Sequence, residues 1–152
     1  MKLPQPEFSR PLTVARIAAK GSHERLEADA KECKALAKRF GVPAVHGLRG
    51  LLLAKPWRGG GVKVTGDVEC DLEQVSVVSL EAFRSTVRFA VERYFLQRHV
   101  LAGGEDEVDP IENGEIDLGE VMAETIALEL DPYPRAEGEA FAGSDDEPGP
   151  VN

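Results

Sequence analysis

Hydrophobic and polar residues alternate most regularly between positions 61 and 72. The hydrophobic set is Val62, Val64, Val68, Cys70 and Leu72. The residues between them are Lys63, Thr65, Asp67, Glu69 and Asp71. A period of two places the two sets on opposite sides of a strand, so this segment is predicted to be a half-buried strand of an antiparallel sheet.

Weaker versions of the same pattern predict further strands on both sides of this one. They cover residues 7–17, 25–30, 48–57, 74–80 and 85–96. Pro11 stands at an edge or bend of the first strand, because proline has no N–H to donate to a sheet ladder. The glycine-rich residues 58–61 predict a turn, and Ser76 and Ser79 are placed within a strand.

Two segments instead repeat their hydrophobic residues at helical spacing. The first is predicted to begin after Asp29 as N-cap and to end at Phe40, before a Gly-Val-Pro stop. The second is predicted to begin after Asp117, with Glu120 returning the cap reciprocally, and to end at Asp131 before a proline.

This order of elements predicts an α+β fold with a mainly antiparallel sheet, which can curl into a partial barrel, and two packed helices. We expect residues 1–141 to form one domain, with a glycine-rich and acidic loop at 102–115. Residues 142–152 have the composition of a disordered acidic tail.

The charge of the chain is divided unevenly along its length. The net charge is −9, yet residues 1–100 contain 17 Lys and Arg against 11 Asp and Glu, while residues 101–152 contain 1 against 16. Attraction to a phosphate depends on local charge rather than on the sum. The basic part therefore predicts an interaction surface, and the acidic part a tail.

Other features argue against membrane, metal and enzyme functions. No run approaches the roughly 20 apolar residues of a membrane span, and no leader is evident, so we expect a cytoplasmic protein. Cys33 and Cys70 are expected in the core, and the three histidines are isolated, so neither a metal site nor a cofactor is predicted. No converging acid, base and pocket is indicated, and we expect no enzymatic activity.

Two groups of cations are candidates for contact with RNA. In the first, Trp57 at a turn stacks on an unpaired base while Lys55, Arg58 and Lys63 hold the backbone. Alternatively, these cations are ordinary solvated residues and Trp57 folds back as a lid on a barrel. The second group is the exposed face of the first helix, where the charge can equally serve solubility; it comprises Lys31, Lys34, Lys38 and Arg39.

The segment DPYPR follows the second helix and also has two interpretations. Pro132 and Pro134 restrict the backbone around Tyr133, and Arg135 offers a planar fork for a carboxylate or phosphate. The segment is then a preorganised contact for RNA or protein. Alternatively it is a helix stop in which Tyr133 packs back on the sheet and the arginine pairs with a nearby acid.

Several ordered motifs together resemble the YceD family, the bacterial large ribosomal RNA subunit accumulation proteins. They are EFSRPL at 7–12, the strand region 61–83, IDLGEVMAETIALEL at 116–130 and DPYPR at 131–135, and the resemblance runs from about residue 7 to 141. The motif residues carried over are Arg10, Asp117, Glu120, Asp131, Pro132, Tyr133, Pro134 and Arg135. Many relatives have Cys-x-x-Cys where this chain has Ser76 and Ser79, so a metal or redox role for that pair is not carried over.

The resemblance implies a cytoplasmic, non-enzymatic factor that supports synthesis, processing or stability of 23S rRNA and assembly of the large ribosomal subunit. Its partners would be rRNA or the pre-ribosomal large subunit, and a basic ribosomal or assembly protein. The alternative hypothesis is an acidic adaptor that binds such a protein through residues 105–147 without touching RNA.

Overall fold

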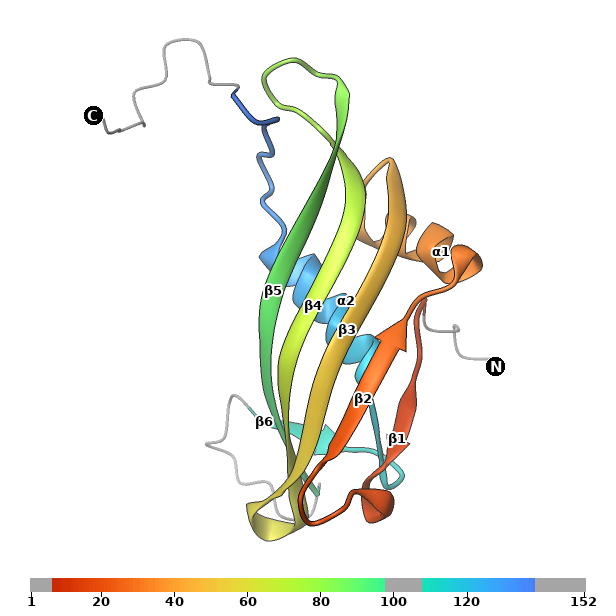
Figure 1. The fold of residues 1–152 in the computed structure, drawn as a ribbon, viewed down its shortest axis with the longest axis vertical. Coiled ribbons are helices and arrows are strands. Elements are labelled where there is room, and N and C mark those ends of the chain that lie inside the picture. The colour runs from red at the N-terminus through yellow and green to blue at the C-terminus, as the bar shows by residue number, and fades with distance from the viewer. Residues whose placement is uncertain (1–6, 98–107, 139–152) are drawn as a thin grey trace, which may run out of the picture.

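A five-stranded sheet forms the body of the protein in the computed structural model, which describes residues 7–97 and 108–138 (Figure 1). Its strand order is β2-β3-β4-β5-β6, and only the β5–β6 pair is parallel. The strands are β2 (Ser22–Glu27), β3 (Ala44–Trp57), β4 (Gly61–Val75), β5 (Ala82–Gln97) and β6 (Val108–Ile111). A two-stranded sheet pairs β1 (Pro11–Thr13) with β7 (Glu115–Asp117).

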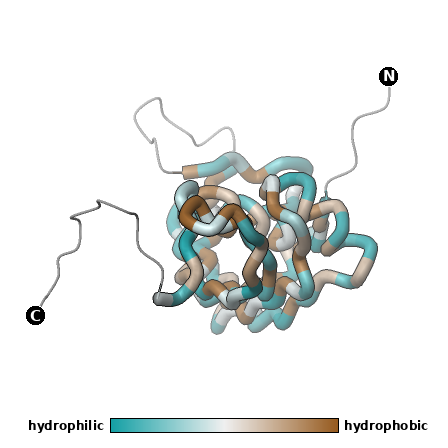
Figure 2. The backbone as a smooth tube through the Cα atoms, turned by 90° about the horizontal axis from the view of Figure 1, so that it is seen from above, coloured by the Kyte–Doolittle hydropathy of each residue, from teal (hydrophilic) through white to brown (hydrophobic). Residues whose placement is uncertain are grey.

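Both helices lie on one face of the large sheet, and no helix or strand of the described residues covers the opposite face, which we call the bare face (Figure 1). They are α1 (Ala30–Phe40) and α2 (Leu118–Glu129). The hydrophobic residues predicted for one side of β4 are all buried between sheet and helices, whereas the polar residues between them are not. Seen from above, hydrophobic and hydrophilic positions alternate along the tube (Figure 2). The predicted α+β fold is confirmed, with an open sheet whose edges are β2 and β6.

The first helix has the predicted boundaries and caps. The Asp29 carboxylate accepts from the N–H of Glu32, and the Glu32 carboxylate accepts from the N–H of Asp29, each at 2.8 Å. Gly41 ends the helix in a left-handed conformation with φ of 70°. In α2, Asp117 caps as predicted by accepting from the N–H of Glu120. The prediction that Glu120 returns the cap to Asp117 is wrong, because the Glu120 carboxylate accepts hydrogen bonds from Arg39 instead.

Four segments differ from the prediction. Residues 28–30 were expected in a strand, but β2 ends at Glu27, because Asp29 caps α1 and Ala30 begins it. Only Pro11–Thr13 of residues 7–17 is a strand, and Val14–Arg16 (η1) is a 3-10 turn. Residues 76–81 form the β4–β5 turn rather than a strand, because the Ser76 hydroxyl accepts the N–H groups of Val78 and Ser79 and takes them out of the ladder. Val108–Ile111 lies in the expected acidic loop but pairs with β5 as a strand. Residues 102–107 of that loop and the tail 142–152 lie outside the described residues.

Candidate nucleic-acid interface

Strand register brings one group of predicted RNA contacts together at the turn between β3 and β4. Lys55 stands opposite Lys63, and Lys63 stands opposite Tyr94 of β5, so these side chains share the bare face of the sheet. Trp57 ends β3, and Arg58 begins the 3-10 turn Arg58–Gly60 (η2) that follows. We call these five residues the basic end.

Two aromatic rings form the centre of the basic end. The Trp57 and Tyr94 ring centroids are 4.7 Å apart, with the rings tilted by 50°. The Arg58 guanidinium lies 4.5 Å from the centroid of the Trp57 ring, and the Lys63 ammonium lies 5.6 Å from that of Tyr94. A hydrogen bond from Tyr94 to the Glu92 carboxylate raises the pKa of the phenol. Trp57 is not the lid of a barrel, because the sheet is open and its ring lies beside Tyr94.

Tyr94 was not among the predicted contacts, although the sequence contains a signal for it. The alternation that places Arg88 and Glu92 on the outer side of β5 places Tyr94 on the same side. What the sequence could not supply is the register that sets β5 against β4 and brings the ring to Trp57.

The bare face carries compensated charge along most of its length. Its ion pairs are Arg49 with Glu69 at 3.2 Å, Arg84 with Asp71 at 2.7 Å and Arg88 with Glu69 at 3.5 Å, and a hydrogen bond of 2.8 Å joins His46 to Glu73. The hydrogen bond from Arg84 lowers the pKa of Asp71. At the basic end the pattern changes, because no described carboxylate forms an ion pair with Lys55 or Lys63.

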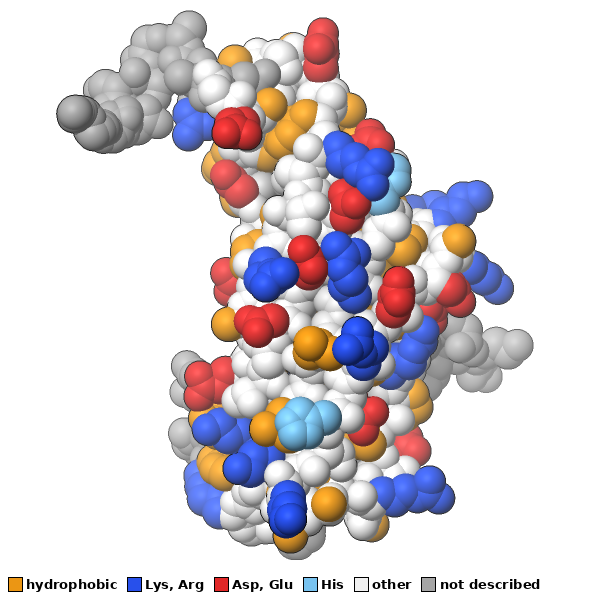
Figure 3. Space-filling view, viewed as in Figure 1, with side chains coloured by type: hydrophobic (Ala, Val, Ile, Leu, Met, Phe, Trp, Pro, Cys, Tyr) orange, Lys and Arg blue, Asp and Glu red, His pale blue; other side chains and the backbone are white. Residues whose placement is uncertain are grey.

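Neighbouring residues add to this positive charge. The Gly21 backbone lies against the Lys55 side chain, so the segment before β2 is also at this end. Residues 16–23 and 55–63 together contain five Lys and Arg and no Asp or Glu. Figure 3 shows the result, with Lys and Arg prevailing at the lower end of the face and mixed charges above it.

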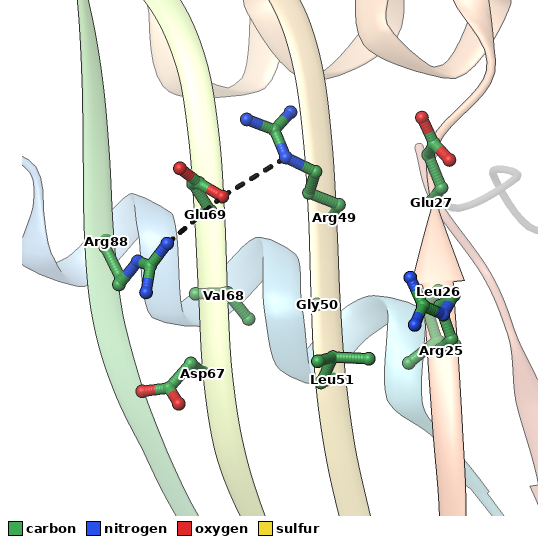
Figure 4. Close-up of a pocket in the computed structure, with 10 residues that line it drawn as sticks. All are labelled: Arg25, Leu26, Glu27, Arg49, Gly50, Leu51, Asp67, Val68, Glu69 and Arg88. Atoms are coloured by element: carbon green, nitrogen blue, oxygen red, sulfur yellow. Dashed lines mark hydrogen bonds and ion pairs between the residues drawn. The ribbon is translucent and has the colours of Figure 1, made fainter.

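A shallow depression of about 290 Å³ lies in the middle of the bare face (Figure 4). Gly50 lies among the residues that line it, and its charged rim includes Arg25, Arg49, Asp67, Glu69 and Arg88. A second hollow shares Arg25 and Leu51 with it and extends to Leu53 and Thr65, two positions from Lys55 and Lys63. Leu51 is 57% exposed. The two hollows therefore offer an extended ligand a path along the bare face from the basic end.

The second predicted group of cations lies elsewhere. Lys31, Lys34 and Lys38 are exposed on α1, which lies away from the β3–β4 turn (Figure 1). Arg39 points to Glu120 and Glu7, with N to O distances of 2.8 and 3.1 Å, and the hydrogen bond to Glu120 raises its pKa. Arg39 therefore joins α1 to α2, and the structure does not bring the two groups of cations together.

The motif residues of the N-terminal segment and α2 form a clasp. The Asp117 carboxylate accepts from the Ser9 hydroxyl at 2.7 Å and from the N–H of Arg10 at 2.8 Å, in addition to capping α2. The N–H of Leu118 donates to the Arg10 carbonyl at 3.0 Å. Gly119 is required here, because a Cβ on it would lie 2.5 Å from the carbonyl oxygen of Phe8.

The Arg10 side chain extends this clasp to α1. Its guanidinium donates to both carboxylate oxygens of Glu32, at 2.7 and 2.9 Å, and to the Glu27 carbonyl at 3.1 Å. The hydrogen bonds between Arg10 and Glu32 lower the pKa of Glu32 and raise that of Arg10. Arg10 and Asp117 therefore hold the fold together, and sequence reasoning missed their partners Ser9, Glu32 and Gly119.

DPYPR connects α2 to the β4–β5 turn. The Pro134 carbonyl accepts from the N–H of Val77 at 2.9 Å, and the Asp131 carboxylate accepts from the N–H of Tyr133. The interpretation in which Tyr133 packs back on the sheet is wrong, because its side chain is 67% exposed. Arg135 lines a groove beside β5 together with Phe83.

The described residues contain no group of three His, Cys, Asp or Glu that could hold a metal ion. Cys33 and Cys70 are free and buried, and burial raises the pKa of both thiols, that of Cys70 to about 12. No helix among the described residues is long and apolar enough to cross a membrane. His99 lies outside the described residues.

A family model described as "Large ribosomal RNA subunit accumulation protein YceD" matches residues 64–151, more than half of the chain. The chain belongs to the YceD family. This confirms the resemblance and assigns the chain a role in accumulation of large-subunit ribosomal RNA. No curated protein and no solved structure matches the chain.

The YceD match covers most of β4, then β5 and α2, and includes Tyr94, Asp117 and DPYPR. Lys55, Trp57, Arg58 and Lys63 precede the matched residues, as does Arg10. Of the basic end, only Tyr94 lies within the matched residues.

Proposed function

We propose that this YceD family member is a cytoplasmic, non-enzymatic factor that binds rRNA at its basic end. Binding there supports synthesis, processing or stability of 23S rRNA and assembly of the large subunit. One observation carries the proposal: two adjacent aromatic rings lie on the bare face beside Lys55 and Lys63, which form no ion pair with a described carboxylate. Proteins that hold single-stranded RNA combine such rings with cations along the backbone.

Charge and shape agree with this function in different ways. The rings provide apolar faces for bases, and each base stacked on an aromatic ring contributes about 1 to 3 kcal/mol. Lys55, Arg58 and Lys63 provide the attraction to phosphate, which needs no particular base sequence. A large-subunit segment with unpaired bases is therefore the expected ligand.

Salt dependence of binding tests the electrostatic part. A fluorescent single-stranded fragment of 23S rRNA is titrated with the full chain at several salt concentrations. If three phosphates are neutralised, log K should fall against log salt with a slope of about −2, since each contributes about 0.7 for a single strand. A salt-independent affinity would overturn the proposal.

Two variants of the basic end, one that removes charge and one that removes a ring, locate the contact. Replacing Lys55 and Lys63 by Gln should weaken binding at least about tenfold and reduce the slope by about 1.4, whereas Trp57→Ala should weaken binding with the slope almost unchanged. The matched control replaces Lys31, Lys34 and Lys38 by Gln and should retain most of the affinity. Loss of binding in the α1 variant alone would place the RNA on α1 instead.

The adaptor hypothesis is separated by crosslinking in cells. RNA recovered with the full chain and sequenced should map to a discrete large-subunit segment. Neutralising Glu105, Asp106 and Glu107 and ending the chain after residue 141 should leave this crosslink intact. If the crosslink is absent from the full chain and only a basic protein is recovered, the chain is an adaptor without RNA contact.

A further inference from the structure

The β4–β5 turn, at the opposite end of the long strands from the basic end, holds a leucine in an unfavourable conformation (Figure 1). Leu80 has φ of 63°, in the left-handed region that a branched side chain rarely adopts. Its side chain is 76% exposed, so burial in the core does not compensate for the strain. Strained residues that persist in a fixed structure are concentrated at functional sites.

The turn is fixed by specific hydrogen bonds. The N–H of Ser76 donates to the Glu81 carbonyl, and the N–H of Leu80 donates to the Ser76 carbonyl, each at 2.9 Å. The Ser76 side chain is buried, and its hydroxyl accepts two further N–H groups. Val77 bonds to the Pro134 carbonyl of DPYPR, so the turn and that segment form one unit. Leu80 is therefore held in place rather than free to turn inward.

Other apolar side chains are exposed at the same end. Among the described residues, the large hydrophobic side chains most exposed to solvent are Leu51, Val75, Leu80, Leu128 and Tyr133. Three of these five lie at this end, because Val75 ends β4, Leu80 is in the turn and Tyr133 is in DPYPR; Val75 is 46% and Tyr133 67% exposed. Tyr133 lies between two prolines, so its backbone loses little freedom when it is covered.

The charge at this end has the sign opposite to that of the basic end. Residues 71–84 and 131–138 contain five carboxylates and two arginines. Arg84 is already bonded to Asp71 through two hydrogen bonds, at 3.0 and 2.7 Å. Glu81 follows Leu80 in the sequence, Asp131 and Glu137 lie on either side of Tyr133, and all three carboxylates are exposed. An apolar centre with an anionic rim fits a cationic partner.

We propose that Val75, Leu80 and Tyr133, with their anionic rim, dock a basic segment of a partner protein that inserts apolar side chains between Lys and Arg. The proposal deepens the proposed function and rests on it in one respect: a factor that holds rRNA at one end and a basic protein at the other brings the two together. The docking itself requires no RNA.

Three synthetic peptides of equal length test the docking. One alternates Lys with Leu, the second replaces every Lys by Glu, and the third replaces every Leu by Ser. The Lys-Leu peptide should bind the full chain, and the other two should bind at least about tenfold more weakly. Covering one leucine contributes about 1.5 to 3 kcal/mol, which corresponds to about tenfold or more.

Leu80→Gly is the decisive variant, because it should affect folding and binding in opposite directions. Glycine adopts a φ of 63° without strain, so the thermal midpoint should be unchanged or higher. Affinity for the Lys-Leu peptide should nevertheless fall at least about tenfold, because the docking side chain is removed. The matched control is Leu128→Ser, an equally exposed leucine on α2, which should leave affinity within about twofold.

Several results would overturn the docking proposal. Unchanged affinity in both Leu80→Gly and Tyr133→Ser would show that the turn is not the contact. Equal binding of the Glu-Leu peptide would contradict the charge argument. Self-association that sedimentation detects and Leu80→Gly abolishes would make a second copy of this chain the occupant. The Lys55 and Lys63 to Gln variant should still bind the Lys-Leu peptide, so failure of RNA binding and failure of docking are distinguishable.

Discussion

At the scale of single residues, Arg10 shows how a motif residue that resembles a binding group can be part of the fold. Its guanidinium donates to both oxygens of Glu32 and to the Glu27 carbonyl, and it lies 4.5 Å from the centroid of the Phe8 ring. A bidentate contact of this kind requires the planar fork of arginine. Arg10 therefore joins the N-terminal segment to α1 and β2.

The Arg10–Glu32 pair predicts a stability that depends on pH. The pKa of Glu32 is lowered in the folded state by the hydrogen bond from Arg10, so its stabilisation is present above the ordinary pKa of about 4.3 and is lost as pH falls through the folded value. Arg10→Gln should lower the free energy of unfolding by about 1 kcal/mol at pH 7 and by much less near pH 3.

Urea unfolding at both pH values measures this difference. The control is Arg49→Gln, which removes a single exposed contact to Glu69 at 3.2 Å and should change stability by less than about 0.5 kcal/mol at either pH. If Arg10→Gln destabilises equally at pH 7 and pH 3, the carboxylate of Glu32 is not the partner that matters.

At the scale of elements, hydrophobic periodicity predicted what depends on local sequence. Hydrophobic and polar residues alternate along β4 and along β5 as expected, and α1 has the expected caps. The β4–β5 turn was missed because it depends on one side chain, the Ser76 hydroxyl, that competes for backbone N–H groups. Strand β6 was missed because its pairing is not a local hairpin. It pairs in parallel with β5, starting at Tyr94, and the sequence of β6 alone does not show this.

The contact sites depended even more on information that one sequence does not contain. The sequence placed Trp57, Lys55 and Lys63 around one turn, and the structure brings them to one face. The sequence does not distinguish Arg39 from the lysines of α1. Arg39 differs because it is bonded to Glu120, which is 81 residues away. Helical spacing shows which residues share a face, but it does not show which of them meet another element.

The packing of α2 against the N-terminal segment predicts that Gly119→Ala is destabilising. Alanine favours an isolated helix over glycine by about 1 kcal/mol, yet its Cβ would lie 2.5 Å from the Phe8 carbonyl oxygen and 3.0 Å from the Arg10 nitrogen. Both contacts are with backbone, which cannot simply rotate away. We expect a net loss of about 1 to 3 kcal/mol in the free energy of unfolding.

Hydrogen exchange identifies the cause of that loss. The amide of Leu118, which donates to the Arg10 carbonyl, should exchange faster in Gly119→Ala than in the native chain. Ala127→Gly, on the exposed side of the same helix, should lose about 1 kcal/mol of helix propensity and leave that amide protected. An unchanged Leu118 amide in Gly119→Ala would mean that the segment accommodates the methyl group.

At the scale of the whole molecule, the chain has two ends of different chemistry joined by long strands. β4 and β5 pair continuously from Val62 and Phe95 to Val75 and Ala82, and they run from the basic end to the β4–β5 turn (Figure 1). Charge between the ends is largely compensated by ion pairs across the bare face. Physiological salt screens electrostatic interactions between exposed charges beyond about 8 Å. The acidic composition of the chain therefore does not prevent attraction of phosphate at one end.

This arrangement predicts separate footprints for two ligands on one protein. Single-stranded RNA should change the amide NMR signals of residues 55–63 and of Tyr94, and leave those of 75–82 and 131–135 unchanged. The Lys-Leu peptide, added without RNA, should produce the reverse pattern. Both follow because rings and cations lie at one end while exposed apolar residues and carboxylates lie at the other. If RNA instead perturbs residues 75–82, or both ligands perturb the same residues, the two ends are not separate sites and the chain binds one ligand at a time.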